Sequence, residues 1–165
     1  MKEKISLLVG KRVLIVDDEP DVLEALEECL DMCDVVQATS FDQAKGLLET
    51  EHFDIAILDI MGVNGYKLLE IGHSKKIITI MLTAHALSVE DTVKSFKEGA
   101  ASYIPKEKMS EIATYIEDVL DAQKMKQHPW SRWVNRFGSY YRKMFGSEWV
   151  DYEEFWKAVL KDKKF

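Results

Sequence analysis

The chain has 165 residues, a formal net charge of −7 and a hydrophobic fraction of 47%. That fraction excludes a wholly disordered protein, and the length suits one domain with an appendage. No apolar run approaches the about 18 residues that a membrane-spanning helix needs, and the apolar patch near the start is too short for a signal peptide. We therefore expect a cytoplasmic protein with no membrane partner.

Charge and aromatic residues are divided unevenly along the chain. Residues 123–165 carry ten Lys and Arg against five Asp and Glu, together with all four tryptophans, whereas residues 1–122 are strongly acidic. An acidic body followed by a basic, aromatic-rich segment indicates two functional parts. We expect an N-terminal tail at 1–10, one domain at 11–122 and a helical extension at 123–165.

Short apolar runs alternate with amphipathic segments throughout the expected domain. The runs predict strands at 12–16, 35–38, 53–59, 77–82 and 101–105, and an amphipathic helix follows each of them. Parallel strands need crossover connections, so this alternation predicts an α/β fold with a five-stranded parallel sheet and helices on both faces.

Polar residues stand where these predicted strands end. They are Asp17 and Asp18 after the first strand, Asp59 at the end of the third, Thr83 after the fourth and Lys106 after the fifth. The carboxyl ends of parallel strands meet at one edge of the sheet, which is where open α/β folds keep their sites. Two carboxylates about 4 Å apart repel by roughly 4 kcal/mol at an effective dielectric constant of 20, so three of them call for a cation. All-oxygen ligands favour Mg²⁺.

This set of groups suits phosphoryl chemistry. Asp59 is the candidate nucleophile that would form an acyl phosphate, while Lys106 and the cation would neutralise the phosphoryl oxygens. The hydroxyl of Thr83 would donate a hydrogen bond to the same group. Taken singly, Asp17 has a bland interpretation as an acid at a helix start, and Thr83 and Lys106 have bland interpretations as an ordinary strand end and a solvated base.

Four segments that carry these residues resemble the receiver domain of two-component response regulators. The resemblance covers about residues 11–122 and includes the order, the spacing and the strand context of the motifs. The matching segments are LIVDDEP at 14–20, ILDIM at 57–61, MLTA at 81–84 and ASYIPK at 101–106.

The resemblance implies a flavodoxin-like, doubly wound sheet with strand order 2-1-3-4-5. It implies a response regulator whose phosphoacceptor is Asp59, with a histidine kinase or a phosphotransfer protein as the phosphodonor. The protein would not be an enzyme beyond its own phosphotransfer and dephosphorylation. It would switch a protein-interaction surface formed by the fourth helix, the fifth strand, the fifth helix and the extension.

The same resemblance assigns a role to each site residue. Asp18, Asp59 and the main-chain carbonyl of Met61 would ligate Mg²⁺ directly, and Asp17 would hold a water molecule on the metal. Thr83 and Lys106 would bind the phosphoryl group. Tyr103 would be the aromatic residue that changes rotamer on activation, although an aromatic residue in a short strand is often only part of the core.

Three features depart from the family pattern. The segment after Asp59 lacks a proline and is about two residues shorter than usual, and Glu107 stands where the family has a proline. His85 lies two residues beyond Thr83, so either it tunes the lifetime of the acyl phosphate or it is an exposed loop residue. The shortened loop keeps an alternative open, a pseudo-receiver that binds partners without being phosphorylated. A phosphohydrolase is disfavoured because Met61 occupies the place of the second acid that such an enzyme needs.

The sequence of the extension predicts two short helices. The first begins near Pro129, carries aromatic residues at helical spacing and has Gly138 as a possible bend or end; the second covers about 151–160. One interpretation is a helical hairpin packed on the domain, and another is a surface for a downstream protein or for self-association. The basic residues form no single stripe, which argues against nucleic acid as a partner. We expect the extension to be the output that phosphorylation releases or reorganises.

Overall fold

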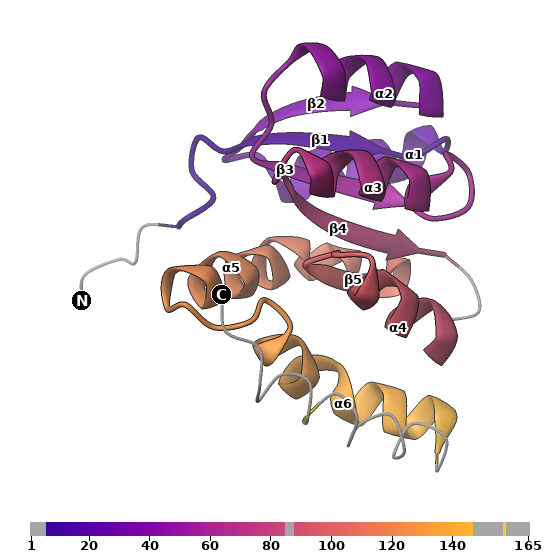
Figure 1. The fold of residues 1–165 in the computed structure, drawn as a ribbon, viewed down its shortest axis with the longest axis vertical. Helices are drawn as coiled ribbons and strands as arrows, with labels where there is room; N and C mark the ends of the chain where they lie inside the picture. Colours follow the sequence, from indigo (N-terminus) through magenta and orange to yellow (C-terminus); the bar gives the residue numbers. More distant parts are fainter. Residues whose placement is uncertain (1–5, 85–87, 147–156, 158–165) are drawn as a thin grey trace.

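The computed structural model describes residues 6–84, 88–146 and 157 (Figure 1). His85 lies outside these residues, and so does the predicted second helix of the extension apart from residue 157. Among the described helices, none is both long enough and apolar enough to cross a membrane.

The centre of the molecule is one parallel sheet in which the strand order is β2-β1-β3-β4-β5. This order confirms the predicted flavodoxin-like α/β fold. The register pairs Val16 with Leu58, Leu58 with Met81, and Thr83 with Pro105, so the carboxyl ends of four strands reach the same edge. The strands are β1 (Arg12–Val16), β2 (Asp34–Ala38), β3 (Ile55–Asp59), β4 (Ile78–Thr83) and β5 (Ser102–Pro105).

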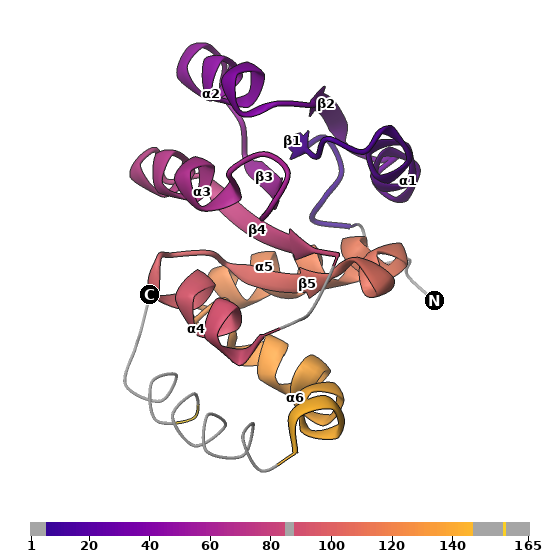
Figure 2. The same cartoon turned by 90° about the vertical axis from the view of Figure 1, so that its right-hand side faces the viewer.

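Helices cover both faces of the sheet, with α1 and α5 on one face and α2, α3 and α4 on the other (Figure 2). Ser40 caps α2 by accepting a hydrogen bond from the amide of Gln43 at 3.2 Å. Ser88 caps α4 by accepting one from the amide of Asp91 at 2.9 Å. The helices are α1 (Pro20–Cys29), α2 (Phe41–Thr50), α3 (Gly65–Ser74), α4 (Val89–Lys97), the 3-10 helix η1 (Lys106–Glu111), α5 (Ile112–Lys124) and α6 (Ser131–Phe145).

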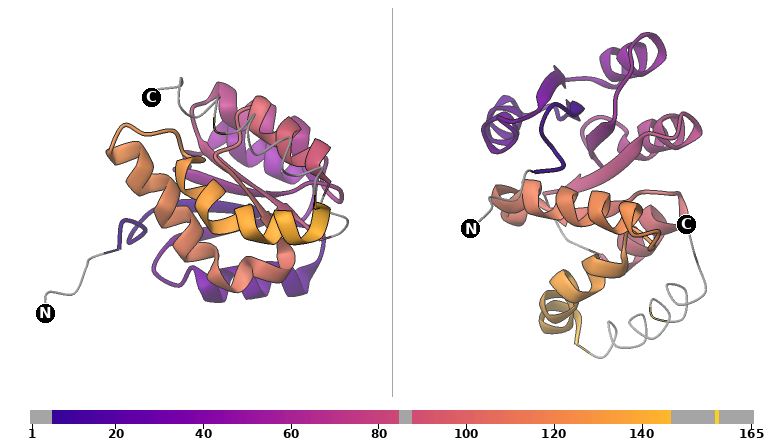
Figure 3. Two further views of the ribbon diagram at one scale, coloured as in Figure 1. Left: turned by 90° about the horizontal axis from the view of Figure 1, so that it is seen from below. Right: turned by 90° about the vertical axis from the view of Figure 1, so that its left-hand side faces the viewer.

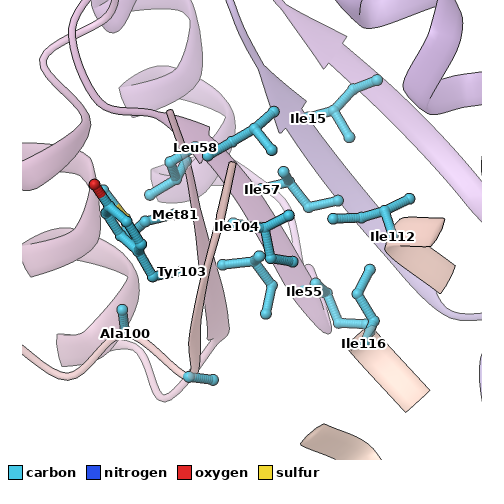
Figure 4. Close-up of a cluster of buried hydrophobic side chains, with 14 of the residues drawn as sticks. Ile15, Ile55, Ile57, Leu58, Met81, Ala100, Tyr103, Ile104, Ile112 and Ile116 are labelled. Carbon is cyan, nitrogen blue, oxygen red and sulfur yellow. The ribbon is translucent and has the colours of Figure 1, made fainter. Parts of the chain in front are cut away.

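The core follows from the apolar strands. All five residues of β3 are buried, as expected for a central strand of a parallel sheet. Figure 4 shows Ile104 facing Ile112 and Ile116 on one side of the sheet, while Tyr103 points to the opposite side beside Met81. Adjacent residues of β5 therefore contact different helical layers.

Residues 6–10 contact the body of the domain. The side chain of Leu8 is fully buried, and the amide of Gly10 donates to the carbonyl oxygen of Met32 at 3.0 Å. The boundary between a tail at 1–10 and a domain at 11–122 stays a prediction.

The helix α6 belongs to the predicted extension and runs across the molecule between α4 and α5 (Figure 3). It begins at Ser131, two residues after Pro129, and continues through Gly138 to Phe145 without a break. Gly138 is buried and is flanked by the buried Phe137, so packing maintains the helix despite the low helix propensity of glycine. Gly146, at φ 58°, ends it.

Candidate functional site

Four of the predicted site residues gather at the carboxyl edge of the sheet. Asp17 directly follows β1, Asp59 is the last residue of β3, Thr83 is the last residue of β4, and Lys106 directly follows β5. Three of them are buried: Asp17 is 0% exposed, Asp59 5% and Thr83 7%. The parallel register therefore brings together groups that are far apart in sequence.

Lys106 is the cation that joins the acids in this structure. Its Nζ lies 2.7 Å from Oδ2 of Asp17, 3.3 Å from Oδ1 of Asp59 and 3.5 Å from Oε1 of Glu19. The other oxygen of Asp17 accepts a hydrogen bond from the amide of Glu19 at 2.9 Å. One ammonium group thus offsets part of the repulsion among three carboxylates.

Burial and pairing act in opposite directions on the titration of this cluster. Burial raises the pKa of Asp17, although the hydrogen bonds from Lys106 and from the Glu19 amide offset part of the rise. For Lys106, burial lowers the pKa, but the contacts with Asp17 and Asp59 outweigh it, and the net pKa is raised. Lys106 is therefore held in its charged form between the two acids.

The shortened loop after β3 folds back onto Asp59 and Asp18. The amide of Gly62 donates to Oδ2 of Asp59 at 3.0 Å. A Cβ atom on Gly62 would lie 2.3 Å from Oδ1 of Asp18, and one on Gly65 would lie 2.3 Å from the main-chain oxygen of Asp59. Asn64 adopts the left-handed conformation with φ 53°. The loop therefore reaches the site without the family's proline, because two glycines allow this close approach.

The acids have a composition that suits a divalent cation. One oxygen each from Asp17, Asp18 and Glu19 can be chosen so that all lie within 4.8 Å of one another. All are hard oxygen donors, which Mg²⁺ prefers. Glu19 is absent from the residues predicted for the site, although it directly follows Asp17 and Asp18 in an acidic run that could have indicated it. The side chain of Met61 is 84% exposed, and the role of its carbonyl stays a prediction.

Tyr103 lies between the site and the helix α6. Its side chain is fully buried, and burial raises the pKa of its hydroxyl group, while the hydroxyls of Thr83 and Thr92 offset part of the rise. The hydroxyl of Thr92 in turn donates to the hydroxyl of Tyr141 at 3.2 Å. Four hydroxyl-bearing side chains from β4, β5, α4 and α6 thus meet in one buried region.

The fold and this edge define a CheY-like receiver. The structure matches the crystal structure of a response regulator receiver domain protein (CheY-like) from Methanospirillum hungatei JF-1, with a TM-score of 0.63 and 31% identity. The match covers 70% of this chain and 98% of that one.

Residues 13–117 match the response regulator receiver domain family, and this chain belongs to that family. The two-component response regulator ARR10 of Arabidopsis thaliana is 32% identical over 141 residues, which are 78% of this chain and 25% of that protein. The probable transcriptional regulator ycf27 of Guillardia theta is 37% identical over 107 residues, 62% of this chain and 42% of that protein. The chain thus spans less than half the length of either relative.

Proposed function

We propose that this protein is the phosphoacceptor of a two-component system and that Asp59 receives the phosphoryl group. The observation that carries the proposal is the position of the Asp59 carboxylate. It ends a fully buried strand at the functional edge of the sheet, with Lys106 at 3.3 Å and the Gly62 amide at 3.0 Å. Those two donors hold the carboxylate in place.

The reaction is a transfer from a phosphohistidine on a histidine kinase or a phosphotransfer protein. A carboxylate oxygen of Asp59 attacks phosphorus, the P–O bond forms and the P–N bond breaks. The leaving imidazole nitrogen keeps the electron pair of that bond. No oxidant or reductant takes part, because the phosphoryl group only changes its acceptor.

The remaining groups stabilise the charge that the transfer brings to Asp59. Lys106, already charged and next to Asp59, pairs with a phosphoryl oxygen, and Thr83 at the end of β4 donates a hydrogen bond to another. Asp17, Asp18, Asp59, Glu19 and the Met61 carbonyl are the candidates to hold Mg²⁺. When bound, this ion supplies positive charge that neutralises the phosphoryl oxygens.

Intact mass spectrometry after incubation with Mg²⁺ and acetyl phosphate tests this proposal. Wild-type protein should gain one base-labile phosphoryl group, and Asp59→Asn should gain none. Omitting Mg²⁺ should abolish the gain in the wild type. If the wild-type protein stays unmodified under conditions that phosphorylate an ordinary receiver, the pseudo-receiver is favoured: a binding scaffold in which the compact loop at Gly62 has disabled phosphorylation.

The role of His85 is tested separately, by the rate at which phosphorylated protein loses its phosphoryl group. If His85→Ala loses the group at the wild-type rate, His85 does not tune the lifetime of the acyl phosphate.

We also propose that the output passes through the face formed by α4, β5 and α5. The helix α6 covers this face and contacts all three elements. Trp133 Nε1 donates to the carbonyl oxygen of Tyr103 in β5 at 2.8 Å, Tyr141 accepts from Thr92 in α4, and Arg136 pairs with Asp118 in α5 at 2.7 Å. A downstream protein, or a second copy of this chain, that uses the same face must displace α6.

Phosphorylation would reach α6 through the buried hydroxyl groups. If Thr83 turns toward a phosphoryl group on Asp59, the packing around Tyr103 changes, and the Thr92–Tyr141 contact lies directly beyond it. Hydrogen exchange of residues 131–145 with and without beryllofluoride, a phosphoryl mimic, measures this coupling. Faster exchange is expected with the mimic in the wild type but not in Asp59→Asn, and equal protection in both states would contradict the output role of α6.

A further inference from the structure

A short turn connects α6 to the domain that precedes it. Residues 125–129 form this turn, between the last residue of α5 and the N-cap residue of α6. Within it, Lys126 has φ 57°, which is the left-handed conformation. The amide of Lys126 donates to the carbonyl oxygen of Gln123 at 3.1 Å, and the amide of Gln127 donates to that of Ala122 at 2.8 Å. These two bonds form a Schellman motif, whose left-handed position is usually glycine.

The turn is strained because a residue with a side chain occupies its left-handed position. The Cβ atom of Lys126 meets steric hindrance in this conformation that glycine does not meet, and the hindrance disfavours the closed turn by about fivefold or more. Pro129 favours an open turn as well, since the residue before a proline prefers an extended conformation. Opening the turn therefore relieves strain that the closed position of α6 requires.

The contacts that hold α6 do not depend on which chain supplies the helix. Two tryptophans donate to main-chain oxygens of the domain, and Arg132 and Arg136 pair with Asp121 and Asp118 of α5. The same atoms are present on a second copy of the chain, so α6 of that copy can make each of these contacts. Four aromatic side chains that are at most 3% exposed form the buried face of the helix. They are Trp130, Trp133, Phe137 and Tyr141.

We propose that α6 is exchanged between two copies of this chain. In the exchanged dimer the turn is open, and α6 of each copy lies on the face formed by α4, β5 and α5 of the other. The contacts of the helix are those of the closed monomer, while the strain at Lys126 is relieved in both chains. Exchange of identical elements is a low-cost route to a dimer, and a short strained connection favours it. The inference rests on the proposed output face only for its role in signalling, because the exchange itself needs no phosphoryl group on Asp59.

Exchange competes with closure of the turn within one chain. A helix on a short connection has an effective concentration in the millimolar range, so closed monomers predominate in dilute solution. Exchange therefore requires either a protein concentration near this value or a turn that resists closing. A dimer contains two turns, so a change of about fivefold in the closure of one turn becomes a change of about 25-fold in the association constant.

A charge-exchange experiment on the full chain tests whether the helices change places. One variant carries Asp118→Arg and Asp121→Arg in α5, and the other carries Arg132→Glu and Arg136→Glu in α6. In either variant alone, every α6 meets like charges on α5, in a monomer and in a dimer. When the two variants are refolded together at about 1 mM, opposite charges meet only in an exchanged heterodimer, in which each domain receives the helix of the other variant.

The mixture should form this heterodimer, whereas each variant alone should remain monomeric. Both pairs are partly exposed, so we expect about threefold from each restored pair and roughly 80-fold from the four pairs of the dimer. Size-exclusion chromatography with light scattering measures the dimer fraction, and native mass spectrometry with one isotope-labelled variant identifies the heterodimer. A mixture with no more dimer than the separate variants would overturn the proposal.

Two further variants test the turn without changing any contact of α6. Lys126→Ile makes the left-handed conformation harder to adopt and should raise the association constant by about 25-fold, while Lys126→Gly should lower it by a similar factor. Lys76→Ile is the matched control, because Lys76 has φ 60° in a turn with the same pair of hydrogen bonds that leads into β4. It should leave the dimer fraction unchanged.

Equal dimer fractions in both Lys126 variants, or an equal rise in Lys76→Ile, would overturn the role of the turn. All samples lack a phosphodonor, and Asp59→Asn should give the wild-type dimer fraction. A failure of exchange is thus distinguishable from a failure of phosphorylation, which the mass-spectrometric experiment measures separately.

Discussion

The two edge strands of the sheet, β2 and β5, differ in how far the rest of the chain buries them. At one edge, β2 has the burial pattern of a solvent-facing strand, in which Asp34 and Gln37 are exposed and only Ala38 is buried. At the other edge, all four residues of β5 are buried. Part of the difference comes from α6 and the residue before it, because Trp133 and Trp130 donate to main-chain oxygens of Tyr103 and Ala100. Figure 1 shows α6 below β5, on the side away from β4.

An edge strand presents main-chain groups that invite pairing with another chain, and proteins protect such edges either with polar residues or with a cover. The β2 edge has the first kind of protection, with Asp34 and Gln37 in the strand itself. The β5 edge has the second, since Trp130 and Trp133 donate to the carbonyl oxygens of Ala100 and Tyr103. A cover that can be displaced would suit the output face proposed above, whereas polar residues within a strand protect its edge permanently.

The largest effect on this contrast is expected from Trp133→Ala. The change removes a side chain that is 3% exposed, together with its hydrogen bond to Tyr103, and leaves a cavity beside β5. We expect a loss of about 4 kcal/mol in the free energy of unfolding, as for other buried aromatic residues replaced by alanine. Urea unfolding measures it. Gln37→Ala at the β2 edge is the control and should change stability by no more than about 0.5 kcal/mol; similar losses in both variants would remove the distinction between the edges.

The second largest effect is expected from alkaline pH, which should lower the stability contributed by the α6 side of the molecule. Burial raises the pKa of Tyr103 and of Tyr141, and burial with the hydrogen bond to Glu111 raises the pKa of Tyr115 to about 12. A group whose pKa is raised by folding contributes stability that is fully present below its ordinary pKa of about 10 and is lost as the pH rises toward the raised value. The elements β2, α1 and α2 contain no tyrosine, so tyrosine ionisation within them does not contribute to this loss.

Urea unfolding at about pH 9 and about pH 11 measures this loss, because the two conditions lie on either side of the ordinary tyrosine pKa. Tyr115→Phe keeps the ring that packs against Phe137 but removes one titrating group. Its stability should therefore fall less between the two pH values than that of the wild type. Parallel losses in the two proteins would show that Tyr115 does not contribute to the pH dependence.

Two neighbouring tyrosines allow a test of a single hydrogen bond under α6. The hydroxyl of Tyr141 accepts from Thr92, whereas the hydroxyl of Tyr140 is buried with no hydrogen-bond partner among the described residues. Tyr141→Phe should cost about 1 kcal/mol, the usual net value of such a bond. Tyr140→Phe should be neutral or slightly stabilising, because it removes an unpaired buried hydroxyl. A greater loss in Tyr140→Phe than in Tyr141→Phe would contradict this arrangement.

Much of the domain follows from local patterns. Short apolar runs predict the five strands, and their alternation with helices requires a parallel sheet, so the meeting of Asp17, Asp59, Thr83 and Lys106 at one edge follows from topology. The strand order itself came from the family resemblance rather than from the periodicity. The structure confirms the five-stranded parallel sheet and its strand order.

The contacts between separate elements could not be predicted in the same way. The aromatic spacing in α6 predicts a buried face but does not specify the surface that it meets, and Gly138 suggested a bend that tertiary packing overrides. The contact of Glu19 with Lys106 depends on the turn after β1, which hydrophobic periodicity does not encode.

The smallest effect that separates the two edges concerns surface charge. Asp118 in α5 accepts from Arg136 of α6 through both oxygens, at 2.7 and 3.2 Å, while Asp34 in β2 lies 3.4 Å from Arg12 and its side chain is 67% exposed. Asp118→Asn should cost about 0.5 kcal/mol at low ionic strength, since the Arg136 side chain is 47% exposed and solvent screens the pair. Asp34→Asn should produce no measurable change. Raising the salt to about 1 M should remove the difference between the two variants, and a difference that persists there would mean that Asp118 holds α6 through packing and hydrogen-bond geometry rather than through charge.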